Sequence, residues 1–136
     1  MAELLKVKTS YSYKGNRNNR VYPKEVLERA FNEPYFKELC SDACVPVLTE
    51  AARPIGYANV CFSDDEVITV NAEIYSPEYI SIIKEAYENI GFILAGRGEA
   101  EQLADNKSVV KNVIFNRVML CEHPAVNFFT EIYKES

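Results

Sequence analysis

The sequence predicts an α+β fold in which a twisted, barrel-like and mainly antiparallel sheet is flanked by two main helices. Three observations support this prediction. Residues 67–75 alternate apolar and polar side chains, a pattern typical of a half-buried strand. Residues 26–31 and 79–87 carry apolar side chains at helical spacing. The other apolar segments are short and rich in β-forming residues, so about six strands are expected in all.

Length and composition predict a single domain over residues 1–136, with an ordinary balance of 48% hydrophobic and 26% charged residues. The net charge of −5 argues against broad binding to nucleic acid, which needs clustered Lys and Arg. The chain contains no apolar run of about 18 residues and no signal-peptide core at its N-terminus. It is therefore expected to be cytosolic, with no nucleic-acid or membrane partner.

The first half of the chain predicts helices separated by turn residues. The polar segment 14–20 (KGNRNNR) is typical of a turn. Pro23 suits the first turn of a helix, and Pro34 either ends that helix or begins a second short one through Leu39. The strands expected in this half are 4–13, 45–48 and 55–62.

The second half predicts a hairpin, a helix and two further strands. Residues 67–75 pair with the preceding strand across an acidic turn. Ser76 is the expected N-cap of a helix that runs to about Asn89, with Gly91 as its stop signal. Tyr79, Ile82, Ile83, Ala86 and Tyr87 are expected to face inward. The strands expected here are 92–95 and 109–121, joined by a turn at 96–98 and a polar connection over 99–107.

Four cysteines, Cys40, Cys44, Cys61 and Cys121, occur in a chain without a secretory signal, so free thiols are expected. Cys40 and Cys44 would share a core-facing side if that stretch is helical. A zinc site would need two more good ligands beside them, and the single histidine, His123, is far away in sequence. We expect no metal, no cofactor and buried, inert thiols.

Three segments in a fixed order resemble the prohead proteases of tailed phages, which are similar in fold to the herpesvirus assemblins. The first segment is 16–27, with its Asn/Arg turn and Tyr-Pro. The second joins 45–48 (VPVL) to 54–57 (PIGY), and the third runs from 70–74 through 91–98 (GFILAGRG) to 118–125 (VMLCEHPA). The resemblance covers about residues 16–125 and implies the fold of that family.

The resemblance also implies a function. Family members are serine endopeptidases that trim scaffold and capsid proteins inside the immature head. The implied partners are therefore phage scaffold or capsid proteins, and the implied location is the bacterial host cytoplasm and the immature phage head. The mechanism needs a serine hydroxyl, a histidine to remove its proton and a third residue to orient that histidine.

Carried over residue by residue, the catalytic positions hold no reactive side chain. The histidine slot falls at Ala51 or Glu50, and the serine slot falls at Ala95 or Leu94. The third member is unknown, because its slot near 117–119 holds no acid. Loss of the nucleophile or base removes on the order of 10⁶-fold in rate in a well-studied serine protease. The chain is expected to be inactive, through natural loss or engineered alanines.

Two other groups are candidates for binding or chemistry. Gly96, Arg97 and Gly98 could present backbone N–H groups and a guanidinium to substrate, or form a plain turn with a solvated arginine. Cys121 and His123 are two residues apart and could form a thiol pair, although a strand-end histidine is the simpler interpretation.

The sequence therefore predicts a head-assembly protein that resembles the maturation protease and is inactive as written. A non-catalytic phage structural or peptide-binding protein that kept the framework is the alternative, and an accidental likeness of an unrelated α+β module is the third. The apolar C-terminal segment, which contains Phe128, Phe129, Ile132 and Tyr133, must pack on the domain or on a second copy. Packing on a second copy would make the protein a homo-oligomer.

Overall fold

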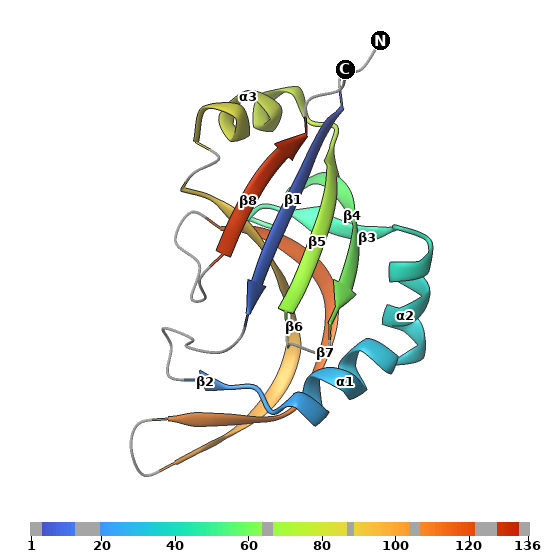
Figure 1. Cartoon of the computed structure of the whole chain (residues 1–136), viewed down its shortest axis with the longest axis vertical. Helices are drawn as coiled ribbons and strands as arrows, with labels where there is room; N and C mark the ends of the chain where they lie inside the picture. The colour runs from blue at the N-terminus through green and yellow to red at the C-terminus, as the bar shows by residue number, and fades with distance from the viewer. Residues whose placement is uncertain are drawn as a thin grey trace.

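A computed structural model describes residues 4–12, 20–63, 67–86, 89–103, 107–121 and 128–133. In this part of the chain, eight strands form one mixed sheet and three helices lie around it (Figure 1). The strand order is β2-β7-β3-β4-β5-β1-β8, with β6 on the other edge of β7. The sheet curls strongly but its order does not close into a ring. The predicted α+β class and the barrel-like, mainly antiparallel sheet are confirmed.

The elements have the following bounds. The strands are β1 Leu5–Ser12, β2 Arg20–Val21, β3 Val45–Leu48, β4 Pro54–Phe62, β5 Val67–Ile74, β6 Gly91–Gln102, β7 Ser108–Cys121 and β8 Phe128–Tyr133. The helices are α1 Lys24–Asn32, α2 Pro34–Ser41 and α3 Pro77–Ala86.

The long strand β7 organises the sheet. Its whole length pairs antiparallel with β6, while its opposite edge pairs in parallel with β2 at one end and with β3 at the other. The other contacts between neighbouring strands, β3–β4, β4–β5, β5–β1 and β1–β8, are antiparallel. The β6–β7 hairpin projects beyond the body of the domain at the lower left of Figure 1.

The core lies inside the curled sheet, and alternation in the strands supplies it. In β5 the residues that face inward, Ile68, Val70, Ala72 and Ile74, are all buried. This alternation confirms the predicted strand at 67–75 and the hairpin it forms with β4. Helices α1 and α2 lie at the right of the sheet in Figure 1, and α3 lies across its upper end.

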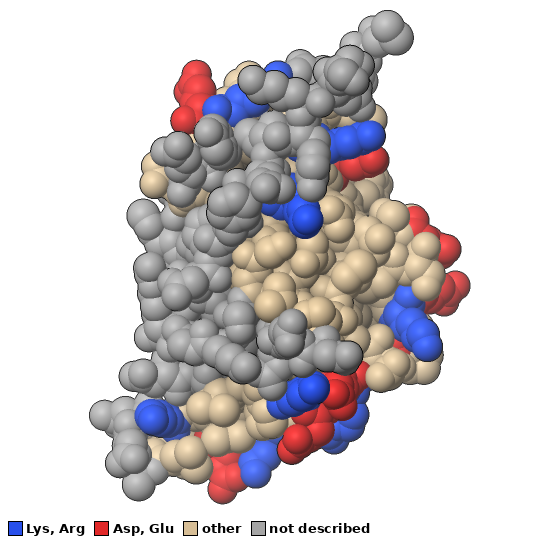
Figure 2. All heavy atoms as spheres, viewed as in Figure 1, with Lys and Arg blue, Asp and Glu red and all other residues tan. Residues whose placement is uncertain are grey.

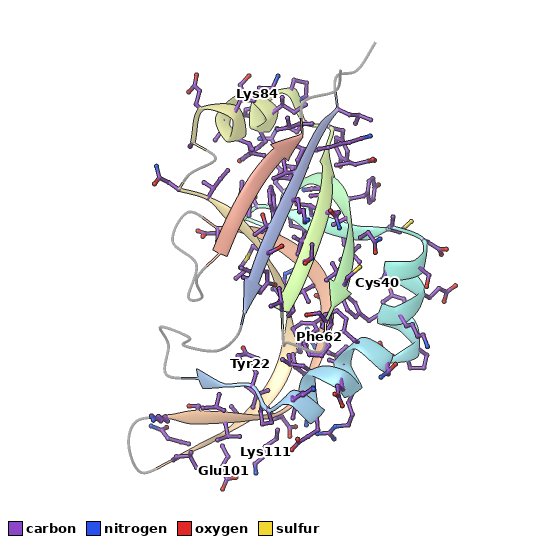
Figure 3. All side chains as sticks on the ribbon, in the orientation of Figure 1. Tyr22, Cys40, Phe62, Lys84, Glu101 and Lys111 are labelled. Atoms are coloured by element: carbon purple, nitrogen blue, oxygen red, sulfur yellow. The ribbon has the colours of Figure 1, made fainter. Side chains whose placement is uncertain are left out.

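Aromatic side chains close the end of the core beside α1 and α2. The Phe31 ring stacks on Phe62 at 5.1 Å between centroids, and Phe36 meets Phe115 at 5.8 Å. Figure 3 shows Tyr22 and Phe62 at this end of the sheet. Helix α2 begins at Pro34, one of the two outcomes expected for this proline, and the Glu33 carboxylate accepts hydrogen bonds from the Tyr35 and Phe36 backbone N–H groups.

Three predictions about the segment after α3 are wrong. Gly91 does not stop the helix, because β6 begins there. The expected turn at 96–98 is extended strand, and the expected connection over 99–107 belongs to β6 up to Gln102. Gly96 allows β6 to continue past residue 95 beside β7. A Cβ at this position would lie 1.9 Å from the Ile114 carbonyl oxygen, so only a glycine lets the two strands approach this closely.

The inward face of α3 also differs from the prediction. Ile80 and Ile83 are buried, whereas Ile82 is 40% exposed. Tyr79 and Ala86 are half-buried, and Tyr87 lies outside the described residues. The C-terminal segment pairs through its backbone with β1, as strand β8, which places it on the domain itself. The described sheet has eight strands where the sequence predicts about six, and α2 is the second short helix that was one of the two expectations for Pro34.

Candidate functional site

The three segments that carry the expected catalytic slots lie on neighbouring strands. Strand β7 lies between β3 and β6, and its Val118 pairs with Val47 of β3 on one side and with Leu94 of β6 on the other. Segments that are far apart in the sequence are thus brought together by β7.

The register also fixes which residues lie level with one another. Ala95 pairs with Arg117, and Met119 pairs with both Leu48 and Ile93. Ala51 lies beyond the end of β3, in the turn to β4. Positions 51 and 95 are therefore separated by two strand spacings, about 10 Å, and by several residues along the strands. An imidazole at 51 would have to reach back across β7 to meet a hydroxyl at 95.

The turn that holds Glu50 and Ala51 is tightly closed. The Thr49 N–H donates to the Arg53 carbonyl oxygen at 2.9 Å, and the Arg53 N–H donates to Thr49 Oγ1 at 3.2 Å. Thr49 is buried, while Glu50 and Ala51 are exposed at the tip. Within the turn Ala52 has a φ of 64°, the left-handed conformation that alanine rarely adopts. Both candidate histidine positions therefore face solvent on a fixed backbone.

Helix α3 supports this turn from one side. Arg53 pairs with Glu78 at 3.1 Å, and its guanidinium lies 5.8 Å from the centroid of the Tyr79 ring. Both charged side chains are 59% exposed, so the ion pair adds little stability. This contact is not predicted from the sequence. Its only sequence signal is the Arg beside Pro54 and the acid in the first turn of the following helix.

The two candidate serine positions have opposite environments. Leu94 is 4% exposed and belongs to the core. Its backbone N–H donates to the Tyr11 hydroxyl at 2.7 Å, a contact that joins β6 to β1 and that no sequence pattern indicates. Ala95 is half-buried and alternates to the other face of β6. A hydroxyl at position 95 would be accessible, whereas one at 94 would be enclosed among apolar side chains.

The candidate binding residues Gly96, Arg97 and Gly98 lie in the ladder between β6 and β7. The pairs are Gly96 with Phe115, Arg97 with Ile114 and Gly98 with Val113, and a bulge lies between Ala95 and Gly96. The Arg97 side chain is exposed. The three residues directly follow the serine slot on the same strand, but as an edge strand and not as the anion-binding turn that the sequence suggests.

The cysteines differ more than the sequence predicts. Burial, together with a smaller contribution from the nearby Glu50 carboxylate, raises the pKa of Cys121 from 9.0 to about 11. Burial also raises the pKa of Cys40 to about 11. Cys44 and Cys61 are exposed, so the prediction of buried thiols is wrong for these two. Cys44 follows the end of α2 and therefore does not share a core-facing side with Cys40.

A thiol nucleophile at Cys121 is disfavoured by this environment, because the reactive form is the thiolate. His123 lies outside the described residues, as do residues 13–19, which include most of the polar turn expected over 14–20. In the described segments no group of three or more His, Cys, Asp or Glu could hold a metal ion. No helix in the described part is long and apolar enough to cross a membrane.

No protein-family profile matches this sequence, and no curated protein matches it. The fold, however, is similar to that of a phage capsid-assembly protease. A solved structure of the bacteriophage T4 capsid assembly protease, gp21, matches with a TM-score of 0.65 and 17% sequence identity. The match covers 84% of this chain and 78% of that chain. At this identity the likeness shows the fold, and it supports the resemblance to the prohead proteases at the level of fold.

Proposed function

We propose that this chain is a phage head-assembly protein that keeps the framework of a maturation protease and does not cleave its partners. The observation that carries the proposal is the fold likeness to a capsid assembly protease, together with alanines at the two slots that the resemblance assigns to histidine and serine. Its partners would be scaffold or capsid proteins, in the host cytoplasm and the immature head.

Inactivity follows from the chemistry of the slots. Ala51 and Ala95 have no group that can attack a carbonyl carbon or accept a proton from a nucleophile. The neighbouring side chains of β7 do not replace them, because Arg117, which pairs with Ala95, is a permanent cation and Met119, which pairs with Ile93, has no titratable proton. The Cys121 thiol stays protonated near neutral pH.

The partner is tested by co-expressing the native chain with the scaffold and capsid proteins of the virus that encodes it. The chain should co-purify with one of them, and intact mass spectrometry should show both partners uncut. Arg97→Ala should weaken the co-purification, because Arg97 is exposed directly after the serine slot. Arg29→Ala, which removes an exposed arginine from α1, is the matched control. Cleavage by the native chain would contradict inactivity, and no association would contradict the partner.

The slots are tested by restoring the missing groups. Ala95→Ser alone should not react with a fluorophosphonate probe. Ala95→Ser combined with Ala51→His or with Glu50→His should react faster only if the turn after β3 brings the imidazole back across β7 to the hydroxyl at 95, where it can remove the serine proton. The two histidine positions are compared because both lie exposed in the same turn. If neither combination exceeds the single variant, the assignment of these slots is wrong, whatever the result of the partner experiment.

One observation favours a second function. The chain could be a non-catalytic structural protein that uses the protease framework to bind a peptide. Strand β6 pairs only with β7 among the described strands, so its other edge presents backbone groups beyond Leu94. An extended peptide could add to such an edge. Retained binding together with failure of every restored variant would favour this function.

A further inference from the structure

A hollow on the outer face of the sheet lies away from the β3–β7–β6 site. It has a volume of about 280 Å³ and opens on β1, β5 and β4. Its polar lining consists of Lys6, Tyr57, Asn59, Asn71 and Glu73. Figure 2 shows this side of the molecule, where an uncharged surface lies over β5 and β4 and charged groups lie at its margin.

The polar side chains are aligned by the strand register. Asn59 of β4 pairs directly with Asn71 of β5, and the neighbouring row joins Tyr57, Glu73 and Lys6 across three strands. Asparagine is disfavoured within strands. Two asparagines placed opposite each other at outward positions therefore cost stability and supply four hydrogen-bonding groups, two carboxamide oxygens and two NH₂ groups, to one spot.

Two further features are independent of the asparagine pair. Ala43 forms part of the rim with a φ of 52°, and strained residues of this kind tend to be retained at functional sites. Tyr57 is 52% exposed, and its ring is held at 5.8 Å from the Tyr75 ring. The hollow therefore has a positioned aromatic wall beside a set of paired donors and acceptors.

The lining selects against several ligand classes. One carboxylate and one ammonium group balance each other, so neither an anion nor a cation is favoured. The carboxamides oppose an apolar ligand, because their hydrogen bonds would be left unmade. The volume lies just below the range of about 300–1,000 Å³ that holds drug-sized ligands. A single neutral, polar ring of small size fits these conditions.

We propose that this hollow binds one pyranose unit of a carbohydrate. A pyranose carries hydroxyl groups that both donate and accept, which Asn59, Asn71 and Glu73 can satisfy. The C–H face of the ring can pack on the Tyr57 ring, as apolar surface packs on aromatic rings generally. The site does not depend on the proposed head-assembly function or on the state of the catalytic slots.

The test is a titration of the ¹⁵N-labelled chain with the methyl glycosides of glucose, galactose, mannose and N-acetylglucosamine, followed by NMR. At least one should shift the amide signals of residues 57–59 and 71–73 with a Kd of the order of millimolar, as a small polar ligand gives. Tyr57→Ala and Asn71→Ala should each weaken binding by about fivefold or more, which corresponds to the loss of one contact.

Matched controls separate the hollow from general surface effects. Tyr35→Ala removes a tyrosine that is 61% exposed on α2, and Asn112→Ala removes an exposed asparagine of β7, so neither should change the Kd. The proposal is overturned if none of the four glycosides shifts these amides at concentrations far above millimolar. Shifts confined to other strands would overturn it as well. This readout on the native chain holds even if a variant fails to fold.

Discussion

Left-handed backbone conformations at two alanines carry a local energetic cost in this chain. Ala43 follows α2 with a φ of 52°, and Ala52 lies in the β3–β4 turn with a φ of 64°. The Cβ of an L-residue crowds the following carbonyl in this region, which costs roughly 1–2 kcal/mol. Both residues lie beside candidate sites, one at the rim of the hollow and one in the turn of the histidine slot.

Ala52→Gly should raise the free energy of unfolding by about 0.5–1 kcal/mol, because glycine removes the Cβ crowding and offsets its own greater unfolded-state entropy. Chemical denaturation measures the change. Ala100→Gly is the control, since Ala100 is exposed in β6 and has no positive φ. That variant should lose about 0.5–1 kcal/mol. Changes of the same sign in both variants would contradict the argument.

The two partly buried thiols predict a loss of stability at alkaline pH. Burial raises the pKa of Cys40 and of Cys121 from 9.0 to about 11 in the folded chain. Below pH 9 both thiols are protonated in the folded and unfolded states, so the free energy of unfolding does not change with their titration and is at its full value. Between pH 9 and 11 the unfolded thiols ionise first, so the free energy of unfolding falls, and it levels off above that window.

Urea denaturation on either side of this window measures the effect. The double variant Cys40→Ala/Cys121→Ala should show a shallower decline between pH 9 and 11, whatever its stability at neutral pH. Cys44→Ala is the matched control and should keep the native slope, because its thiol is exposed. Equal slopes in this variant and in the double variant would refute the assignment.

At the scale of elements, close packing between β6 and β7 sets the geometry of the projecting hairpin. Two bulges interrupt the pairing, between Ala95 and Gly96 and between Glu99 and Ala100. Gly96 lies at the first bulge, where a Cβ would meet the Ile114 carbonyl oxygen at 1.9 Å. Bulges twist and bend a strand, and this bending lets β7 pair with both β2 and β3 along one edge.

Gly96→Ala should therefore lower the free energy of unfolding by about 1–3 kcal/mol, the usual cost of forcing extra volume into a packed site. Thermal or urea denaturation measures it. The control is Glu99→Ala on the same strand, whose exposed side chain accepts a hydrogen bond from Asn112 at 3.3 Å. This change should stay within about 0.5 kcal/mol. A neutral Gly96→Ala would show that the strands can separate at no cost.

For the whole molecule, the contact between Tyr11 and Leu94 links β6 at one edge of the curled sheet to β1, the strand next to β8 at the other edge. Tyr11 is 3% exposed on β1, and its hydroxyl accepts a hydrogen bond from the Leu94 N–H of β6 at 2.7 Å. Strands β1 and β6 do not pair with each other. This side-chain contact therefore provides a polar link across the side on which the sheet is not closed.

Tyr11→Phe should lower the free energy of unfolding by about 1–3 kcal/mol, because the buried Leu94 N–H loses its acceptor. Hydrogen exchange at the Leu94 amide should become faster in the same variant. Tyr57→Phe is the control, since Tyr57 is 52% exposed, and it should change stability by less than about 0.5 kcal/mol. Unchanged exchange at Leu94 would show that the hydroxyl does not protect this amide.

Most elements could be predicted because their signals are local. Alternation specifies β5, Pro34 marks the start of α2, and apolar spacing marks the buried side of α1. The second half of β6 could not be predicted, because glycine and charged residues are typical of turns. Only its partner strand makes it extended: β7 supplies backbone partners along the whole of 96–102. The side of α3 that faces inward was decided by the neighbouring strands.

The candidate site divides in the same way. Which residue types occupy the expected slots can be read from the sequence, and alanine at 51 and 95 fixes the absence of an imidazole and a hydroxyl there. The sequence does not show which strands lie together, because the pairing of β7 with β3 joins residues about 70 positions apart. The asparagine pair of the hollow likewise arises only when β4 and β5 align.

The sequence by itself determined the α+β class, the order of most strands and helices, and the chemical content of each position, because these depend on side-chain periodicity and residue type. The tertiary structure alone decided that β7 lies between β3 and β6, that β6 extends through its glycines, and that polar residues of three strands line one hollow. Those arrangements depend on hydrogen bonds and packing between segments distant in the sequence, which no local pattern specifies.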